Sequence, residues 1–275
     1  MPVINTNTAA NSAVRYLNAN SSQQSESLSK LASGSRINKA SDDAAGLAIA
    51  TRLQSDVTAL DQAATNAAHS ISILQTADGG ASNISDILQR MKALASESAS
   101  GTVTDNERVY IDAEFQQLAD EIDGIASGTR FNGESLLDGT SAFAGSGVSV
   151  MVGTQATDTI SLKIADLDAT ELGVASLATT SQTGAEAAIS ALDDAIDAVS
   201  SARADIGATM SRFEFRSDTI ATTTENLEAS ESAIRDVDVA AEQAKLSAAE
   251  VKTQAAVAAA AQANQMPQQL LNLLQ

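Results

Sequence analysis

Two stretches set the architecture of this 275-residue chain: LSKLASGSRINKASDDAAGLAIATRL at residues 28–53 and AQANQMPQQLLNLL at residues 261–274. No proline occurs between Pro2 and Pro267. Because proline breaks a helix more strongly than any other residue, its absence allows long uninterrupted helices. We therefore expect long helices at both ends of the chain.

The first of these stretches also contains a break between two helices. Gly34 and Asn38 interrupt the helical pattern, and the run from Ser41 to Asp43 places an N-cap and an acidic first turn ahead of the next helix. On physical grounds alone, this segment is a helix-turn-helix corner.

The composition argues against a thick globular core and against several functions. Aromatic residues make up only 3% of the chain and tryptophan is absent, which favours thin, elongated helical packing. The chain has 35 acidic and 16 basic residues, and its net charge of -19 repels nucleic acid and anionic membranes. The absence of cysteine excludes disulfides and thiolate sites. Neither a secretory signal nor an apolar run of ~20 residues is visible, so secretion would need a dedicated export route.

Candidate catalytic residues are few. His69 is the only histidine and lies beside alanines on a helical stretch, so we expect it to be a solvated surface side chain. The paired carboxylates of Asp193 and Asp194 lack a surrounding polar cluster, and a solvated helix face accounts for them. We predict a protein that is not an enzyme, with no catalytic residue, cofactor or metal site.

Both chain ends are poor in charge. Arg15 is the only charged side chain before Glu26, and none follows Lys252. Such segments form helices with small side chains that cannot bury themselves alone, so each end needs a partner helix. Packing on a helix suits the tail better than anchoring in a membrane, because no basic residue lies beyond Lys252. This polymerisation tail is predicted to use Leu270, Leu271, Leu273 and Leu274.

Apolar residues spaced alternately three and four apart predict a coiled coil of three antiparallel helices. The first helix is expected between Asp43 and Ser100, and it should continue through Gly79 and Gly80 because the apolar phase does not slip there. The predicted rod seam consists of Leu53, Val57, Leu60, Ile71, Leu74, Leu88, Met91, Phe115, Leu118, Ile122, Ile189, Leu192, Ile196, Val199, Ile206, Met210 and Phe213.

Capping boxes mark where the other two helices begin. Thr104 and Glu107 predict a capping box at the start of the second helix, and Thr183 and Glu186 predict one at the start of the third.

The middle of the chain has a different character. It is rich in Gly, Ser and Thr, and apolar residues alternate at residues 148–152 and 160–164, which predicts a hairpin with its turn at residues 153–158. The preceding RFNGESLLDG at residues 130–139 is expected to be a loop that leads out of the helical bundle. The fold class is therefore mainly α: a long antiparallel coiled-coil rod with terminal helices and a small β-hairpin region at mid-chain.

Several motifs together resemble bacterial flagellin. They are the two opening stretches, QTADGG at 75–80, RFNGESLLDG, and ARADIGATMSRFE at 202–214, and the resemblance covers roughly residues 1–139 and 185–275. It implies a short form with inner and rod domains only. The implied segments are the N-terminal inner helix 1–33, a connector 34–43, the rod halves 44–139 and 183–234 flanking a β-hairpin region 140–182, a connector 235–240 and the C-terminal inner helix 241–275.

The resemblance also implies a function and partners. Flagellin is a secreted structural subunit that polymerises through pairing of its terminal helices into the extracellular bacterial flagellum, which serves swimming motility. The implied partners are further copies of the chain, an export chaperone, the flagellar type III export apparatus, and the filament cap and hook-filament junction proteins. A host's Toll-like flagellin receptor is a further expected partner, whereas nucleic acid and membranes are not.

Site residues implied by the resemblance lie on the rod. Arg90, Leu94 and Glu114 match positions that contact the receptor or neighbouring subunits, and Gln89 beside them also points away from the seam; an ordinary polar helix face is the alternative. O-linked glycans are expected on the hydroxyls of Ser141, Ser146, Ser149, Thr154 and Thr157.

Three residues depart from the family pattern. Lys252 and Ala260 stand where leucine is usual, and Gln275 stands where a basic residue is common, which affects the expected packing of the tail.

Two other classes stay open at this point. A flagellin-like hook-filament junction protein would share the N-terminal motif but usually lacks the AQANQ-type tail. A cytoplasmic coiled-coil signalling domain would share the acidity and the alanine-rich heptads, yet it would not need charge-free ends.

Overall fold

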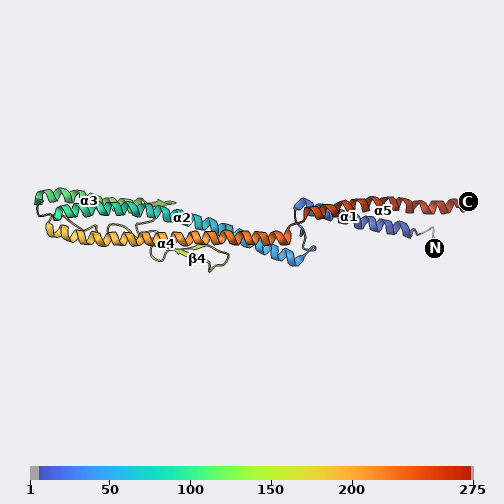
Figure 1. The fold of residues 1–275 in the computed structure, drawn as a ribbon, viewed down its shortest axis with the longest axis horizontal. Helices are drawn as coiled ribbons and strands as arrows, with labels where there is room; N and C mark the ends of the chain where they lie inside the picture. The colour runs from blue at the N-terminus through green and yellow to red at the C-terminus, as the bar shows by residue number, and fades with distance from the viewer. Residues whose placement is uncertain (1–5, 274–275) are drawn as a thin grey trace. The chain divides into compact units, whose positions relative to one another are not determined.

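The computed structural model describes the backbone of residues 6–273 and the side chains of residues 6–266. The predicted mainly α fold is confirmed, with two small antiparallel hairpins between the third and fourth helices (Figure 1). The elements of this range are α1 (Thr8–Ser33), α2 (Ala44–Ala99), α3 (Asp105–Gly128), β1 (Arg130–Phe131), β2 (Glu134–Ser135), β3 (Val148–Met151), β4 (Thr159–Leu162), α4 (Gln182–Arg235) and α5 (Val239–Leu273).

The chain forms two compact units. The terminal unit combines the residues up to Val57 with those from Asn226 onward, and the central unit is Thr58–Glu225. Both boundaries fall inside a helix, α2 in one case and α4 in the other. The terminal unit joins the two ends of the chain, and the central unit, although continuous in sequence, brings α2 together with α4, so pairing of distant helices organises both of them.

Helix α2 runs without a break through Gly79 and Gly80, as predicted. A β-carbon on Gly79 would meet nothing within 4 Å, whereas one on Gly80 would lie 2.5 Å from Oγ1 of Thr129 and 2.7 Å from Cδ1 of Leu137. Gly80 is therefore a site of close approach, where the segment after α3 lies against α2.

The first hairpin corrects the expectation of a loop at residues 130–139. Strands β1 and β2 are joined by Asn132 and Gly133, whose φ angles of 52° and 88° are those of a two-residue turn that matches strand twist. The chain consequently folds back, and Leu136 and Leu137 become buried. The segment packs on the helices and does not lead away from them.

The second hairpin has the predicted strands and turn. Val148 pairs with Leu162 and Val150 with Ile160, and the turn is closed by a bond from the Val152 N–H to the Asp158 carbonyl. Two side chains bind this hairpin to the helices. The Asn66 amide of α2 donates to the carbonyl of Met151 at 3.1 Å, and Arg216 of α4 donates to that of Val152 at 3.1 Å.

In the central unit, α3 and α4 each run antiparallel to α2 (Figure 1). Lys92 of α2 pairs with Asp193 of α4, and Asp78 pairs with Arg203 at 2.8 Å, so positions rise along one helix as they fall along the other. Of the predicted seam residues, the buried ones are Val57, Leu60, Leu74, Leu88, Met91, Phe115, Ile122, Leu192, Val199, Ile206 and Phe213. Leu53, Ile71, Leu118, Ile189, Ile196 and Met210 are half-buried.

The buried face of α4, its contact line, contains alanines in place of two of the predicted isoleucines. Ala188, Ala195 and Ala202 are buried, while the isoleucines next to the first two of them, Ile189 and Ile196, stay half-buried. A small side chain lets helices approach closely, so the contact line runs through the alanines and not through their bulkier neighbours.

One predicted cap is present and one is misplaced. At α3, the Glu107 carboxylate accepts hydrogen bonds from the backbone N–H and the hydroxyl of Thr104, both at 2.8 Å, and these bonds lower the pKa of Glu107. The box predicted at Thr183 is wrong, because α4 begins at Gln182. Ser181 caps it: its hydroxyl accepts from the Gly184 N–H at 3.1 Å.

We predict that Ile206→Asp strongly destabilises the chain, because Ile206 is 1% exposed on the α4 contact line. An unpaired carboxylate buried there should cost several kcal/mol, on the order of 3 to 5. The control Asp194→Ala replaces an exposed side chain on the same helix and should change stability by less than ~0.5 kcal/mol. Thermal denaturation followed by circular dichroism measures both, and equal melting temperatures would show that the assigned helix phase is wrong.

Candidate assembly interface

Helices α1 and α5 of the terminal unit form an antiparallel pair (Figure 1). The Asn7 side chain at the start of α1 donates to the carbonyl of Ala263 at 2.8 Å. Near the other end of α1, the Ser27 hydroxyl donates to Glu242 at 2.6 Å. The two ends of the chain are therefore partners of each other.

The limits of α1 follow from its caps. Asn7 is the N-cap, since its Oδ1 accepts from the Ala10 N–H at 3.0 Å, and the same side chain also holds α5. Gly34 ends the helix with a φ of 71°, the left-handed conformation that glycine adopts without strain.

The contact line of the α1–α5 pair consists mainly of small or polar side chains. On α5 the buried residues repeat at heptad spacing, with Thr253 and Ala260 half-buried between them. On α1, Ser27 is the one buried residue, and Leu17 and Leu31 are half-buried. The buried residues of α5 are Glu242, Leu246, Ala249, Ala256 and Ala263.

Over the side chains that the structure describes, up to residue 266 of α5, such an interior buries little apolar area for helices of 26 and 35 residues, so this part of the pair gains little stability from its own packing.

A buried ionic group lies on this contact line. Glu242 is 5% exposed, and its carboxylate accepts from Ser27 at 2.6 Å and from Lys245 at 2.8 Å. The hydrogen bonds from Lys245 and Ser27 lower the pKa of Glu242, so it stays ionised at neutral pH. Lys30 pairs with Glu26 at 2.6 Å, and this bond raises the pKa of Lys30. The buried hydrogen bond from Ser27 to Glu242 fixes the register of the two helices.

The two segments that connect the helices of the terminal unit bind each other. Ser35 and Asp236 form an isolated antiparallel bridge, the Arg36 N–H donates to the carbonyl of Arg235 at 2.6 Å, and Val237 donates to Gly34 at 3.0 Å. Sequence reasoning missed this pairing, since neither segment carries an alternating strand pattern.

Large apolar side chains of the pair lie outside its contact line. Val14, Tyr16 and Leu28 on α1 are 48%, 62% and 58% exposed. On α5, Val251, Val257 and Met266 are between 50% and 66% exposed. Single exposed apolar side chains are common on protein surfaces, but these lie on a pair whose own described interior is small.

The predicted tail leucines lie at the edge of what the structure describes. The backbone of α5 extends to Leu273, whereas the side chains of Leu270, Leu271 and Leu273, and the whole of Leu274, lie outside the described residues. Of the departures from the family pattern, Lys252 is exposed and Ala260 is half-buried, and Gln275 is outside this range.

Of the candidate contact residues of the central unit, all but Leu94 are exposed. Gln89 is exposed, and Arg90 pairs with Glu114 at 2.6 Å with side chains 57% and 47% accessible. Leu94 is only 3% exposed, so it is a packing residue of the folded chain and offers almost no surface. It lies one helical turn beyond Met91 on the buried face of α2.

Of the candidate glycan acceptors, all but Ser141 are exposed. Ser146, Ser149, Thr154 and Thr157 are exposed. The hydroxyl oxygen of Ser141 is buried and makes no hydrogen bond, so it is not accessible for modification in the folded chain.

No helix among residues 6–273 combines the length and the hydropathy needed to cross a bilayer. Over the same part of the chain, no cluster of three or more His, Cys, Asp or Glu side chains has the geometry of a metal site.

Comparison with known proteins gives consistent matches along the chain. Residues 4–142 match the bacterial flagellin N-terminal helical region, and residues 189–274 match the bacterial flagellin C-terminal helical region. A flagellin of Halalkalibacterium halodurans is 40% identical over 99% of both chains, and a flagellar filament 30.7 kDa core protein of Treponema maltophilum is 38% identical over 99% of both. The crystal structure of Bacillus cereus flagellin, at 33% identity and a TM-score of 0.52, covers 61% of this chain and 94% of its own.

A pair of terminal helices joined in sequence to a three-helix unit is the architecture of a helical structural protein. The chain belongs to the bacterial flagellin family. It is a structural subunit of the flagellar filament, and the hook-filament junction protein and the signalling domain are not favoured.

We predict that Glu242→Gln weakens the α1–α5 pair at neutral pH by about 1 kcal/mol, because a hydrogen bond to a charged acceptor is stronger than one to a neutral amide. The pKa of Glu242 is lowered on folding. Its ionic contribution is therefore fully present above its ordinary pKa of about 4.3 and is lost as the pH falls through the lowered value.

Melting curves of the whole chain between pH 3 and pH 7 measure this difference. Wild type and Glu242→Gln should differ at pH 7 and converge at the acidic end. The control Glu250→Gln removes an exposed charge on the same helix and should match wild type throughout. A gap between wild type and Glu242→Gln that persists unchanged at pH 3 would contradict the ionic role.

Proposed function

We propose that the chain polymerises through its α1–α5 pair, with the outward face of each pair covered by neighbouring copies. The observation that carries this proposal is the difference between the interior of the α1–α5 pair and its exposed surface. The interior line of the pair is mostly alanine and polar side chains, while Tyr16, Val251 and Met266 are half or more exposed. Burial of these side chains between copies would supply the apolar area that the isolated pair lacks.

Membership in the family supports a proposal for the remaining partners. An export chaperone would hold the C-terminal helix before assembly, the flagellar type III export apparatus would carry the chain out, and the filament would grow between a hook-filament junction protein and a cap. The location proposed for the assembled chain is the extracellular flagellum. The absence of charge beyond Lys252 supports a tail that binds protein partners.

The segment boundaries read from the sequence are proposed on the same basis. The connectors 34–43 and 235–240 would join the inner helices 1–33 and 241–275 to the rod segments. Their support is that α1 ends at Ser33, and that both connectors take part in the Ser35–Asp236 bridge.

A host receptor is a further proposed partner, with a site on α2 and α3. Arg90 and Glu114 form an exposed pair that contributes a median of only ~0 to 1 kcal/mol to folding, so it is free to serve intermolecular contacts. Gln89 lies beside it. Leu94 is left out of this proposed surface because it is buried.

We predict that removal of residues 241–275 abolishes polymer growth, because it deletes the partner of α1. The central unit should keep its helices, since its buried residues lie between positions 58 and 225. Electron microscopy after seeding tests growth, and circular dichroism tests folding. Normal filaments from the truncated chain would refute the assembly proposal.

For the receptor, we predict that Arg90→Ala combined with Glu114→Ala reduces signalling by free chains at least about tenfold in a reporter-cell assay, as expected for loss of a charged hot spot. The melting temperature should stay within about 2 °C of wild type, because the pair is exposed. The matched control is Lys92→Ala with Asp193→Ala, a second exposed pair on the same unit. Full signalling by the folded Arg90 and Glu114 double variant would leave these residues as an ordinary polar helix face.

A further inference from the structure

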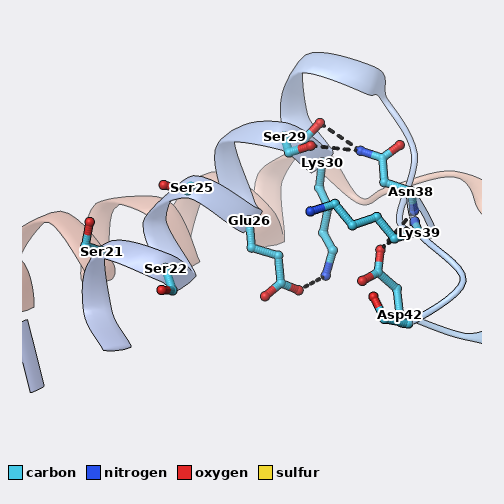
Figure 2. A pocket seen from close by; sticks show the side chains of 10 residues that line it. Ser21, Ser22, Ser25, Glu26, Ser29, Lys30, Asn38, Lys39 and Asp42 are labelled. Atoms are coloured by element: carbon cyan, nitrogen blue, oxygen red, sulfur yellow. Dashed lines mark hydrogen bonds and ion pairs between the residues drawn. The ribbon is translucent and has the colours of Figure 1, made fainter. Parts of the chain in front are cut away.

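The terminal unit contains a polar groove between α1 and the loop that follows it, and its charges are compensated within the chain (Figure 2). Glu26 of α1 pairs with Lys30 at 2.6 Å. On the loop wall, backbone hydrogen bonds from Asn38 and Lys39 lower the pKa of Asp42, and the nearby ammonium groups add to this effect. Two acidic and two basic side chains line the groove, so it does not select a charged ligand.

A second pocket lies in the central unit, between α2 and the hairpin of β3 and β4, and has a volume of about 300 Å³. The described residues that line it include no Asp, Glu, Lys or Arg. Asn66, His69 and Ser149 supply polar groups, and the rest of the lining is mainly apolar. We call it the hairpin pocket; its main apolar side chains are Ile73, Phe143, Val150 and Leu162.

The charge of the central unit makes this pocket a favourable place for contact between copies. The central unit carries 25 of the chain's 35 acidic side chains and 8 of its 16 basic ones. Two such units repel each other over most of their surfaces. An apolar pocket without carboxylates is a place where a second copy can bind without adding to this repulsion.

The geometry of a filament requires a second, different surface to pair with the pocket. The chain is a filament subunit, and contacts that extend an open-ended polymer of identical subunits join two different surfaces of the same chain. The central unit carries two well-exposed aromatic side chains, Tyr110 on α3 at 78% and Phe215 on α4 at 74%. Each of them is a candidate to enter the hairpin pocket of a second copy.

Tyr110 lies far from the hairpin pocket along the central unit. Arg108, two residues before it, donates to the carbonyl of Ser98 near the C-terminal end of α2 at 2.9 Å. Ser98 is about 44 Å from His69 along the axis of α2, because a helix rises ~1.5 Å per residue. The tyrosine and the pocket are therefore on separate parts of the unit.

Phe215 lies level with the pocket, because the adjacent Arg216 donates to the carbonyl of Val152 in the hairpin at 3.1 Å. A contact between Phe215 and the pocket would set two copies side by side with little offset along the unit. Growth in length requires a contact between positions that are separated along the subunit. Tyr110 meets this requirement and Phe215 does not.

We propose that, in the filament, Tyr110 of one copy inserts its ring into the hairpin pocket of a second copy. This inference rests on the proposed polymerisation and adds a second contact to that of the α1–α5 pair. A tyrosine suits the pocket because its ring is apolar and its hydroxyl needs a polar partner, which His69 and Ser149 offer. Repetition of the contact offsets each copy lengthwise from the last and leaves the polymer open-ended.

Cross-linking between single-cysteine variants tests the contact, because the chain has no cysteine of its own. Filaments are grown from an equal mixture of 15N-labelled Tyr110→Cys chains and unlabelled Ser149→Cys chains, then treated with a short bis-maleimide that spans the space of the missing ring. The proposal expects mixed-label dimers joined between positions 110 and 149. A mixture of Phe215→Cys and Ser149→Cys chains is the control and should give at least about tenfold fewer dimers, because its cysteines lack a shared contact.

The outcomes separate this inference from the proposed function. Equal yields of dimers from the two mixtures, or filaments without the link between positions 110 and 149, would overturn the tyrosine contact alone. Absence of any polymer from the unsubstituted chain would overturn the proposed function, and this inference with it.

Substitution gives an independent test. Tyr110→Ala should raise the critical concentration for polymerisation at least about tenfold, as expected for loss of a buried aromatic anchor, whereas Tyr110→Phe should keep it within about threefold. Ser149→Trp, which fills the pocket, should act like Tyr110→Ala. The two together should exceed neither alone, because both remove the same contact. All these side chains are exposed, so the melting curves of free chains should match wild type. Effects of Tyr110→Ala and Ser149→Trp that multiply, or no effect of Tyr110→Ala, would refute the contact.

Discussion

The contact line between α1 and α5 is the constraint on which the terminal unit depends. It brings the two ends of the chain together, and the buried positions that the structure describes are small or polar except for Leu246. Small side chains let two helices approach closely but remove little apolar surface from water. The pair therefore has a defined geometry and a small stability of its own. Its outward face carries the bulkier apolar residues, which is the arrangement expected of a subunit that completes its core by assembly.

Polar contacts supply the specificity that this line of small residues lacks. A stripe of alanines would tolerate a shift of one heptad, whereas the bond from Ser27 to Glu242 and the bond from Asn7 to Ala263 are satisfied in one register. The Ser35–Asp236 bridge adds a third fixed point just beyond the C-terminal end of α1. Without these three contacts the helix pair could slide at little cost in buried area.

Periodic features of the fold were predictable from the sequence, and local features were predicted less well. The uninterrupted α2, the cap at Thr104 and the hairpin of β3 and β4 each follow from a repeating pattern or a two-residue signature. The Asn132-Gly133 turn had a clear signature as well, and it was missed because its flanking strands are only two residues long. The burial of Leu94 and the choice of alanines for the α4 contact line depend on helix-to-helix distance, which spacing alone does not encode.

For the candidate site, the sequence indicated the role of the chain ends but not their contacts. The scarcity of charge before Glu26 and after Lys252 predicted partner helices. The buried position of Glu242 could not be predicted, because a lone glutamate near a helix start is usually a solvated first-turn residue. The pairing of the two connectors depends on the tertiary arrangement and has no local signal.

Hydroxyl-radical footprinting of Tyr16 and Met266 tests the central claim most directly, that further copies of the chain cover the outward face of the α1–α5 pair. Both side chains are at least half exposed in the single chain and should be readily oxidised there. In the polymer the account predicts that both become protected, with oxidation rates at least about tenfold lower, as expected for side chains buried in a protein interface. Equal oxidation rates in the free chain and in intact filaments would contradict the account.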